Sequence, residues 1–520
     1  MLYSLSLDWR SSARSDAKAI NMGKTGKIAL GLLSFGGMVV LGALWYLETR
    51  DQREPSRVAF LEHCASCHGP DGSGPDLLAQ SHAAGSADEL TKRILVQHVG
   101  LVAEAQFPEP MVKAMALYVI EQRLGLPSIT DSHAHTIPQG IVQSQHHDFR
   151  VELITEVGKG PYSIAPLPDG RILLVEKVRG LSVIDTSGKQ GDLIEGTPRV
   201  WSEIAQVGGS FAVLGSMLDV ELHPDYASNG WIYLSHSDRC QLGCGSPWPV
   251  TMVRVIRGRL VGNRWIDSEV IWSVDQDKYT VVPDTVASGR LAFDHQGFGY
   301  VTVGGKSTYD NLHVMDKPYG KIHRFNDNGS VPEDNPFWQE EQPSDPTSSR
   351  NTVWTYGHRT VQGLTTDPRT GDIWATEMGP RGGDEINLIQ RGGNYGWPLY
   401  TEGLDYNGER VSIGEDLGLD FEFSATIPPV VDFTPAPSLS NFTFHNGDQF
   451  PDWQKDLLVG SLRAQTLFRV RIEDGKAVER ERLLTQLGRI RDVEMGYDGF
   501  VYMLIEHNQT GSLIRLVPTN

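Results

Sequence analysis

Apolar positions change their spacing twice along this chain. Residues 28–47 form an apolar run without a charged side chain, long enough to cross a bilayer as a helix. Residues 87–99 and 111–124 show the three-and-four spacing of helices with one apolar face. From Phe149 onward the apolar runs are short and end in Asp, Gly or Pro, a pattern typical of strands and turns. The chain is therefore expected to contain an apolar span, a small all-α domain and a large β domain.

One motif recurs six times in the β region: an apolar run, a turn that holds Asp, usually with Gly or Pro, and a second apolar run. The six occurrences begin at Leu167, Leu222, Phe293, Thr366, Phe450 and Gly496. Sheets that cannot bury a face alone must stack on their neighbours, and radial stacking gives a β-propeller. The recurrence predicts an all-β six-bladed propeller over residues 149–520. A two-sheet sandwich is the alternative, which the similarity of the hairpins disfavours.

Charges beside the apolar run predict its orientation. Glu48 and Asp51 follow the run, and five basic residues precede it: Arg10, Arg14, Lys18, Lys24 and Lys27. The positive-inside rule then puts residues 1–27 in the cytoplasm, makes residues 28–47 a transmembrane anchor and leaves the remainder outside. A cleaved signal peptide is the alternative, although the sequence Gly-Ala-Leu-Trp at 42–45 is a poor cleavage site. We expect a single-pass protein of the bacterial inner membrane whose functional domains lie in the periplasm.

Composition narrows the picture further. A chain of 520 residues is too long for one ordinary core and favours a large domain with a small one. The formal net charge of −19 argues against nucleic acid as a partner. In an oxidising compartment Cys240 and Cys244 are expected to form a disulfide that closes a small loop, with two unpaired thiols as the alternative.

The other two cysteines carry the strongest chemical signal. Cys64-Ala65-Ser66-Cys67-His68 places two thiols three residues apart, with a histidine directly after them. Two such thiols can each add across a haem vinyl group while the histidine ligates the iron, so the motif is that of a c-type haem site. A chance pentapeptide or a redox Cys-x-x-Cys is the alternative. We expect residues 51–126 to be a cytochrome c domain that carries covalent haem c and transfers electrons.

The sixth iron ligand is less clearly marked. Small cytochromes c present a methionine in a loop before the last helix, but residues 100–110 contain none. Met111 is the first candidate and His98 the second, while Met115 is expected to pack in the core. Residues 127–148 are polar and histidine-rich, and we expect a solvated linker there rather than a metal site.

Several stretches of the β region match a known family: GKIHR at 320–324 with DNP at 334–336, YGHRTVQGL at 356–364, EMGPRGGDEINLI at 377–389, GNYGWP at 393–398 and GRIRDV at 488–493. With these stretches, residues from about 150 to 517 resemble the soluble glucose/sorbosone dehydrogenases, six-bladed quinoproteins that use pyrroloquinoline quinone (PQQ) and calcium. The resemblance implies oxidation of an aldose or related alcohol. A base would take the proton of the anomeric hydroxyl while hydride passes to the quinone.

The resemblance also assigns binding residues. Arg359 would face the reactive quinone carbonyls, and three further arginines would hold the quinone carboxylates: Arg463, Arg489 and Arg491. The resemblance also assigns calcium ligands. The backbone carbonyls of Gly379 and Pro380 would bind the calcium ion at the cofactor. Three other residues match positions linked to a structural calcium ion: Asp384, Glu385 and Tyr395. For each arginine the alternative is an ordinary salt bridge within the propeller.

The chain departs from the family at the position of the catalytic base. Val286 stands where the family has its catalytic histidine, four residues before Arg290, and valine cannot accept a proton. Leu214, Gly305 and Thr360 replace polar family residues as well. The catalytic residue is therefore unknown. One of four other histidines would have to act as the base instead: His223, His295, His313 or His358. We do not expect this, because such histidines are more often packed in the core.

Two functions fit these observations. The first is a membrane-anchored periplasmic dehydrogenase that oxidises a small sugar or alcohol and passes electrons through haem c to a respiratory acceptor. Tethering the haem to the propeller raises its effective concentration as an acceptor. The second is a catalytically degenerate propeller that binds a ligand or protein beside a haem c domain. A quinone that binds while another group supplies the base is a variant of the first.

Overall fold

The computed structural model describes residues 54–68, 87–98, 102, 107–123, 126, 136–201, 204–207, 210–213, 215–241, 244–246, 249–280, 288–305, 308–340, 349–406, 408–507 and 510–519. The chain divides into two units, residues 1–52 and 53–520. The first unit, with the expected cytoplasmic segment and anchor, lies outside the described residues. Within the described ranges, no helix is long and apolar enough to cross a membrane.

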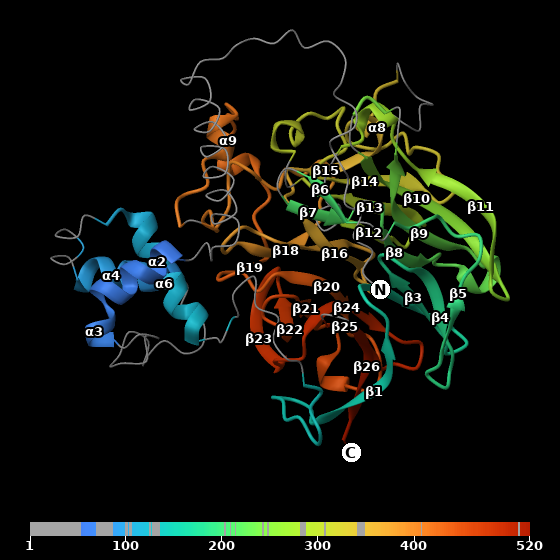
Figure 1. The fold of residues 1–520 in the computed structure, drawn as a ribbon, viewed down its shortest axis with the longest axis horizontal. Helices are drawn as coiled ribbons and strands as arrows, with labels where there is room; N and C mark the ends of the chain where they lie inside the picture. Colours follow the sequence, from blue (N-terminus) through green and yellow to red (C-terminus); the bar gives the residue numbers. More distant parts are fainter. Residues whose placement is uncertain are drawn as a thin grey trace, which may run out of the picture. The chain divides into compact units, whose positions relative to one another are not determined.

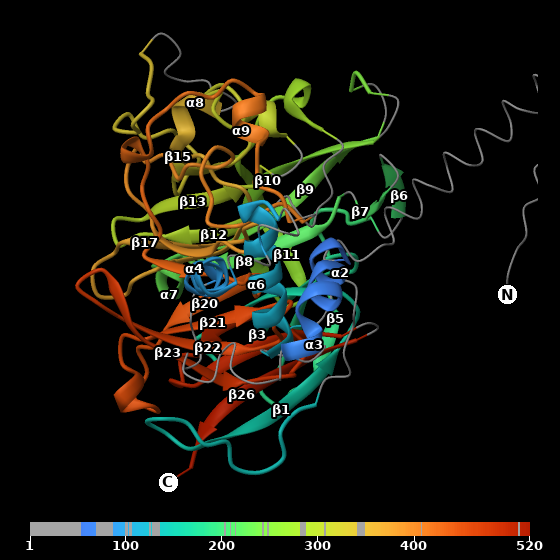
Figure 2. The same ribbon diagram turned by 90° about the vertical axis from the view of Figure 1, so that its left-hand side faces the viewer.

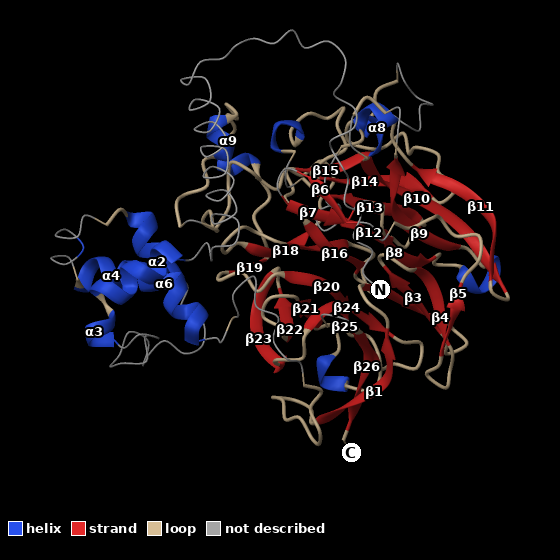
Figure 3. Ribbon diagram, in the orientation of Figure 1, coloured by secondary structure: helices blue, strands red, loops and turns tan. Residues whose placement is uncertain are grey.

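Six four-stranded antiparallel sheets form the large domain (Figures 1 and 3). The first three sheets comprise β2 (Pro161–Pro166), β3 (Ile172–Glu176), β4 (Gly180–Ile184) and β5 (Gln190–Leu193); β8 (Met217–Leu222), β9 (Ile232–Cys240), β10 (Val250–Val261) and β11 (Arg264–Trp272); and β12 (Ser288–Phe293), β13 (Phe298–Val303), β14 (Lys321–Asn326) and β15 (Val353–Tyr356).

The next two sheets and the last one complete the set: β16 (Val361–Thr366), β17 (Ile373–Glu377), β18 (Asp384–Leu388) and β19 (Val431–Phe433); β20 (Leu439–Phe444), β21 (Leu457–Ser461), β22 (Leu467–Glu473) and β23 (Lys476–Leu484); and β24 (Arg489–Met495), β25 (Val501–Glu506) and β26 (Gly511–Pro518) with β1 (Phe149–Val157). Each sheet's first strand contacts the first strand of the next sheet in a closed cycle. The predicted six-bladed propeller is confirmed, and the sandwich is excluded.

Short elements decorate the propeller: the ribbon of β6 (Ile204–Val207) and β7 (Ser210–Val213), and the one-turn helices α7 (Tyr226–Asn229), α8 (Ser349–Thr352) and α9 (Ile413–Asp416). The predicted disulfide between Cys240 and Cys244 is present and closes a loop after β9.

The recurrent motif forms the turn between the first and second strands of every sheet. In the third sheet Asp294 Oδ1 accepts the backbone N–H groups of Gln296 and Phe298 at 2.9 and 3.0 Å. Gly297 then has a φ of 85°, a conformation that costs glycine little. Because the same turn closes each sheet, all six motifs lie at one end of the propeller, and the opposite end is left for longer loops.

Strand β1 closes the ring. It pairs with β26 from Phe149–Pro518 to Val157–Gly511, so a strand that precedes the other five sheets completes the last one. This pairing joins the two ends of the propeller sequence and leaves no open first or last blade.

A buried ion-pair cluster lies where the first strands converge. The Arg290 side chain on β12 places Nη1 3.0 Å from Asp219 Oδ1 and 3.1 Å from Asp492 Oδ1. Its Nε donates to the carbonyl oxygen of Gln362 at 2.9 Å. These partners come from β8, β24 and β16, so one guanidinium ties four blades together.

The described part of residues 51–126 is helical. It consists of α2 (Glu54–His63), α3 (Ala65–His68), α4 (Ala87–Gln97) and α6 (Glu109–Arg123), with α2, α4 and α6 lying together (Figures 1 and 2). Phe60 from α2 and Leu90 from α4 pack on the Leu117 face of α6 in one apolar cluster. We refer to these helices as the helical domain.

Candidate functional site

The predicted arginines gather at the end of the propeller opposite the recurrent turns. In an antiparallel sheet the start of the first strand lies beside the end of the second, and the register pairs Val361 with Glu377, Leu439 with Ser461 and Arg489 with Glu506. Arg359 lies two residues before β16 and Arg463 two residues after β21. Topology therefore brings residues from three blades to one rim, which we call the arginine rim.

Arg359 is buried and held over backbone carbonyls. Its Nη1 donates to the carbonyl oxygens of Met378 and Gly379 at 3.0 and 2.8 Å, and its Nη2 donates to the hydroxyl of Tyr406 at 3.2 Å. The guanidinium carbon lies 5.3 Å from the centre of the Trp397 ring. The side chain is thus fixed by four neighbours before any ligand binds.

Glu377 at the end of β17 fixes the backbone that carries Arg359. One carboxylate oxygen accepts the backbone N–H groups of Arg359 and Thr360, and the other lies 2.8 Å from His358 Nδ1. His358 Nε2 is 2.9 Å from Thr355 Oγ1, and its ring stacks on Tyr395. Both ring nitrogens are engaged, so His358 is a packed histidine and not a free base.

Arg489 and Arg491 share one carboxylate. Their Nε atoms lie 3.1 and 2.8 Å from the same oxygen of Glu506, as expected for alternate residues on one face of a strand. Burial alone would raise the pKa of Glu506, but the charges of Arg491 and Arg489 hold it below its usual value. An anion that binds here must therefore share these arginines with a carboxylate already in place.

Arg463 contacts the helical domain. Its Nη2 lies 3.1 Å from Glu121 Oε1, and Glu121 Oε2 lies 3.5 Å from Nη2 of Arg381, a residue of the loop between β17 and β18. All three side chains are buried. Sequence reasoning missed Glu121 and Arg381, because no motif connects a helix near residue 120 with a propeller loop.

The residues assigned to calcium point in different directions. Asp384 is fully buried and accepts the backbone N–H groups of Gly379 and Leu439 at 2.9 and 2.8 Å; burial raises its pKa to about 7. Glu385 lies on the opposite face of β18, and the Tyr395 hydroxyl donates to the carbonyl of Leu388. Across the described residues, no group of three or more His, Cys, Asp or Glu side chains is arranged to hold a metal ion.

The carbonyl of Gly379, assigned to the cofactor's calcium together with that of Pro380, is taken by a cation already. The Arg359 guanidinium donates to it at 2.8 Å. A calcium ion at this oxygen would have to share it with a positive charge, so this carbonyl does not fit the expected ion.

One departure from the family has a steric cause. A Cβ at Gly305 would lie 2.3 Å from a Leu312 methyl and 2.6 Å from the His358 carbonyl oxygen. The backbone therefore leaves no room for an aspartate there. Val286 and Leu214 lie outside the described residues.

Each of the four alternative histidine bases is either already engaged, as His358 is, or remote from the arginine rim. His223 and His295 line a cavity of about 360 Å³ among the recurrent turns, at the opposite end. His313 Nε2 lies 2.8 Å from the Trp397 carbonyl oxygen, which engages it as a donor. The structure instead places His507 next to Glu506, at the end of β25 on the arginine rim. Its position after a strand is visible in the sequence, but no motif marks it.

The haem-motif residues lie in the helical domain. Cys64 and Cys67 are both free thiols, and burial raises the pKa of Cys64. The His68 ring lies 5.8 Å from the His98 ring, centre to centre. The Nδ1 atoms of both are buried and have no hydrogen-bond partner among the described residues. Met111 packs against the apolar cluster of the helical domain.

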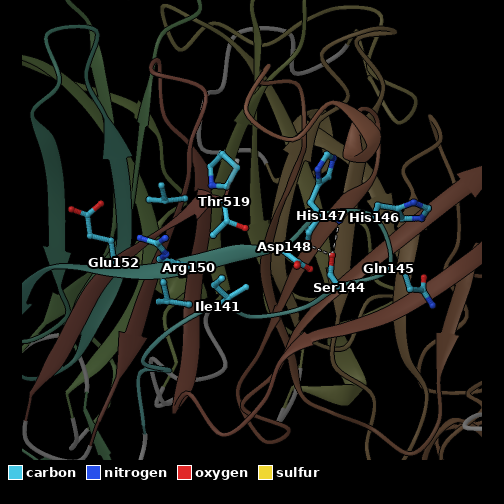
Figure 4. Close-up of a pocket in the computed structure, with 12 residues that line it drawn as sticks. Ile141, Ser144, Gln145, His146, His147, Asp148, Arg150, Glu152 and Thr519 are labelled. Atoms are coloured by element: carbon cyan, nitrogen blue, oxygen red, sulfur yellow. Dashed lines mark hydrogen bonds between the residues drawn. The ribbon is translucent and has the colours of Figure 1, made fainter.

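The second half of the expected linker packs on the propeller. His146 Nε2 lies 3.0 Å from Glu479 Oε1, and His147 Nε2 accepts the backbone N–H of Asp452 at 3.0 Å. His146 and His147, together with the start of β1 and the end of β26, line a cavity of about 1080 Å³ (Figure 4). None of the predicted site residues lines it.

Comparisons with known proteins agree with this geometry. Residues 159–515 match the family described as Glucose / Sorbosone dehydrogenase. The chain is 32% identical over 380 residues to aldose sugar dehydrogenase YliI of Escherichia coli (strain K12), covering 71% of this chain and 93% of the relative. It is 24% identical over 442 residues to quinoprotein glucose dehydrogenase B of Acinetobacter calcoaceticus, covering 71% and 87%.

A solved structure gives the same result. The crystal structure of the soluble aldose sugar dehydrogenase from Escherichia coli in the apo-form matches with a TM-score of 0.60 and 30% identity, over 71% of this chain and all of that one. The helical domain precedes the matched residues. By its sequence match and its six-bladed propeller, the chain belongs to the glucose/sorbosone dehydrogenase family.

Proposed function

We propose that this protein oxidises an aldose sugar at the arginine rim with PQQ and passes the electrons to a haem c in its own helical domain. The single observation that carries the first part is the convergence of Arg359, Arg463, Arg489 and Arg491 on one rim of a sugar dehydrogenase propeller. A quinone with three carboxylates needs such a set of guanidinium donors.

Two buried atoms support binding of a polar ligand there. Arg359 Nε and Thr360 Oγ1 have no hydrogen-bond partner among the described residues. An orphaned buried donor costs free energy that a ligand can recover. The name of the quinoprotein relative supports the same cofactor class.

The residues of this chain would bind the quinone and orient it. Glu377 holds the backbone of Arg359, and Trp397 flanks its guanidinium, so this charge is preorganised toward the ligand. A bound quinone would supply the acceptor for the hydride of the sugar's anomeric carbon, and a base of the chain would take the hydroxyl proton. Val286 cannot be that base. His507 is the histidine we propose for this role: it follows β25 at the arginine rim, and its Nε2 lies 3.0 Å from Ser512 Oγ.

The electron acceptor is proposed from the helical domain. Cys64 and Cys67 would attach the haem, and His68 would ligate its iron. The ring centres of His68 and His98 lie 5.8 Å apart, so both side chains would be near enough to hold one haem iron. This geometry favours His98 over Met111 as the sixth ligand. The disulfide between Cys240 and Cys244 supports a periplasmic location, with residues 28–47 as the anchor and a respiratory protein as the final acceptor.

Dye reduction by the purified full chain tests the dehydrogenase. With PQQ and calcium added, a panel of aldoses should reduce an artificial dye, and Arg359→Gln should lower the rate at least about 100-fold, as removal of one preorganised donor does. Arg391→Gln is the matched control, because Arg391 is an exposed arginine whose side chain donates to the Asp334 carbonyl. Bound PQQ without sugar-dependent dye reduction would contradict the proposal.

A ligand-binding propeller without oxidation chemistry is the second candidate. The observation that favours it is that each predicted arginine already has a protein partner: carbonyls for Arg359, Glu506 for Arg489 and Arg491, and Glu121 for Arg463. In that case PQQ would fail to saturate the protein, and haem would be present in a chain that oxidises no sugar.

A further inference from the structure

Glu121 on helix α6 is a buried carboxylate that faces the propeller. It is fully buried, and the two cations nearest to it come from different propeller loops: Arg463 at 3.1 Å and Arg381 at 3.5 Å. A buried carboxylate is tolerated only when cations or donors compensate the lost hydration. Both of these cations belong to the propeller.

Hydrogen bonds between the propeller and the helical domain surround this carboxylate. Arg381 Nη1 donates to Ser56 Oγ at 3.0 Å and Nη2 donates to the Ala114 carbonyl oxygen at 3.3 Å, so one propeller arginine binds both α2 and α6. At the edge, Lys113 Nζ donates to the Glu402 carbonyl oxygen at 3.2 Å.

Apolar packing continues the same contact. Leu404, which follows β18 in the chain, belongs to the apolar cluster of the helical domain. Next to it, a Cβ at Gly408 would come within 2.8 Å of the Ala114 Cβ. Only a residue without a side chain permits this approach. Charge, hydrogen bonds and packing thus hold the helical domain against the arginine rim.

The same contact involves Arg463, one of the arginines expected to bind the quinone carboxylates. Arg463 uses Nη2 for Glu121 and donates from Nη1 to the Ala436 carbonyl oxygen at 3.2 Å. One end of the guanidinium thus faces Glu121 as an ion pair, and the other end donates to a carbonyl. A ligand carboxylate that pairs with Nη2 would displace Glu121 from it.

We propose that Glu121 is a built-in carboxylate that competes with a carboxylate-bearing ligand for Arg463, so that docking of the helical domain and binding at Arg463 are mutually exclusive. This inference rests on the proposed function, in which the ligand is PQQ. Removal of the Glu121 charge should then strengthen PQQ binding. In that variant PQQ no longer has to displace an internal carboxylate before it can bind Arg463.

Equilibrium binding of PQQ to the full chain tests this competition. Quenching of tryptophan fluorescence reports binding, since Trp397 lies beside Arg359. Glu121→Gln should lower the Kd about ten-fold. Glu109→Gln is the matched control: Glu109 is an exposed acid on the same helix, and its loss should leave the Kd unchanged.

A second variant covers failure of Glu121→Gln to fold. Lys113→Glu changes a side chain at the edge of the contact and should loosen docking, lowering the Kd several-fold. Equal Kd values in the wild type and both loosened variants would overturn the competition while the proposed function stands. If PQQ binds none of the proteins, the quinone part of the proposed function fails and the competition fails with it.

Discussion

Single side chains decide what the arginine rim can bind. The sequence predicts Arg359, Arg489 and Arg491 there, and the alternation of strand residues predicts that the last two share a side. It does not predict that Glu506 holds both of them. Nor does it predict Glu121, because burial of an acid against a distant loop leaves no local pattern. The substitution at Gly305 is visible in the sequence, but its cause, the space filled by Leu312, is not.

The sixth haem ligand can be tested at this scale. If His68 and His98 ligate one iron, His98→Ala should convert a low-spin haem spectrum to one with an open position, with haem content retained. Met111→Leu should leave the spectrum unchanged, because Met111 packs in the apolar cluster. Visible absorption and electron paramagnetic resonance of the purified protein measure this. A spectral change in Met111→Leu and none in His98→Ala would restore the methionine prediction.

A buried histidine should make stability depend on pH. Burial lowers the pKa of His323 to about 3, and its Nε2 donates to the Pro318 carbonyl at 3.0 Å. The unfolded chain takes up a proton below about pH 6.5 and the folded chain does not, so this stability is present above pH 6.5 and is lost as pH falls toward 3. At pH 5 the loss is about 2 kcal/mol.

Comparison of urea unfolding at pH 7 and pH 5 measures this effect. His323→Gln should show a smaller loss of unfolding free energy between the two pH values than the wild type. His295→Gln, at an exposed turn, serves as the control and should keep the wild-type loss. The same loss in His323→Gln and the wild type would show that His323 does not cause it.

At the scale of elements, the turns could be predicted and the ring closure could not. Each recurrent motif shows its turn locally, through Asp, Gly and the flanking apolar runs. The pairing of β1 with β26 joins the two ends of the propeller sequence, and no local pattern records a partner so far away. The second half of the expected linker also packs on a distant part of the chain, the sheet β20–β23. Its polar composition therefore does not indicate this packing.

Strand β1 should therefore contribute strongly to stability. Phe149 is fully buried against Phe450 and Trp453, whereas Leu153 on the same strand is 46% exposed. Phe149→Ala should lower the free energy of unfolding by about 3–5 kcal/mol, and Leu153→Ala by less than about 1 kcal/mol. Denaturant unfolding monitored by tryptophan fluorescence measures both. Similar losses in the two variants would contradict the role given to β1.

At the scale of the whole molecule, a family propeller is joined to a helical domain that the family match does not include. The resemblance predicts the propeller and its arginines, and the haem motif predicts the helical domain. Their contact through Glu121, Arg381 and Arg463 depends on the folded surfaces of both. Because both domains belong to one chain, the proposed haem would stay near the propeller even when this contact opens.

Absorbance of the haem during sugar oxidation tests this account most directly. The full chain is prepared with oxidised haem, PQQ and calcium are added, and an aldose is then mixed in while the haem bands are followed. We predict reduction of the haem that requires both quinone and sugar and whose rate is independent of protein concentration, because the transfer is intramolecular. A protein that reduces an external dye with the sugar while its own haem stays oxidised would contradict the account.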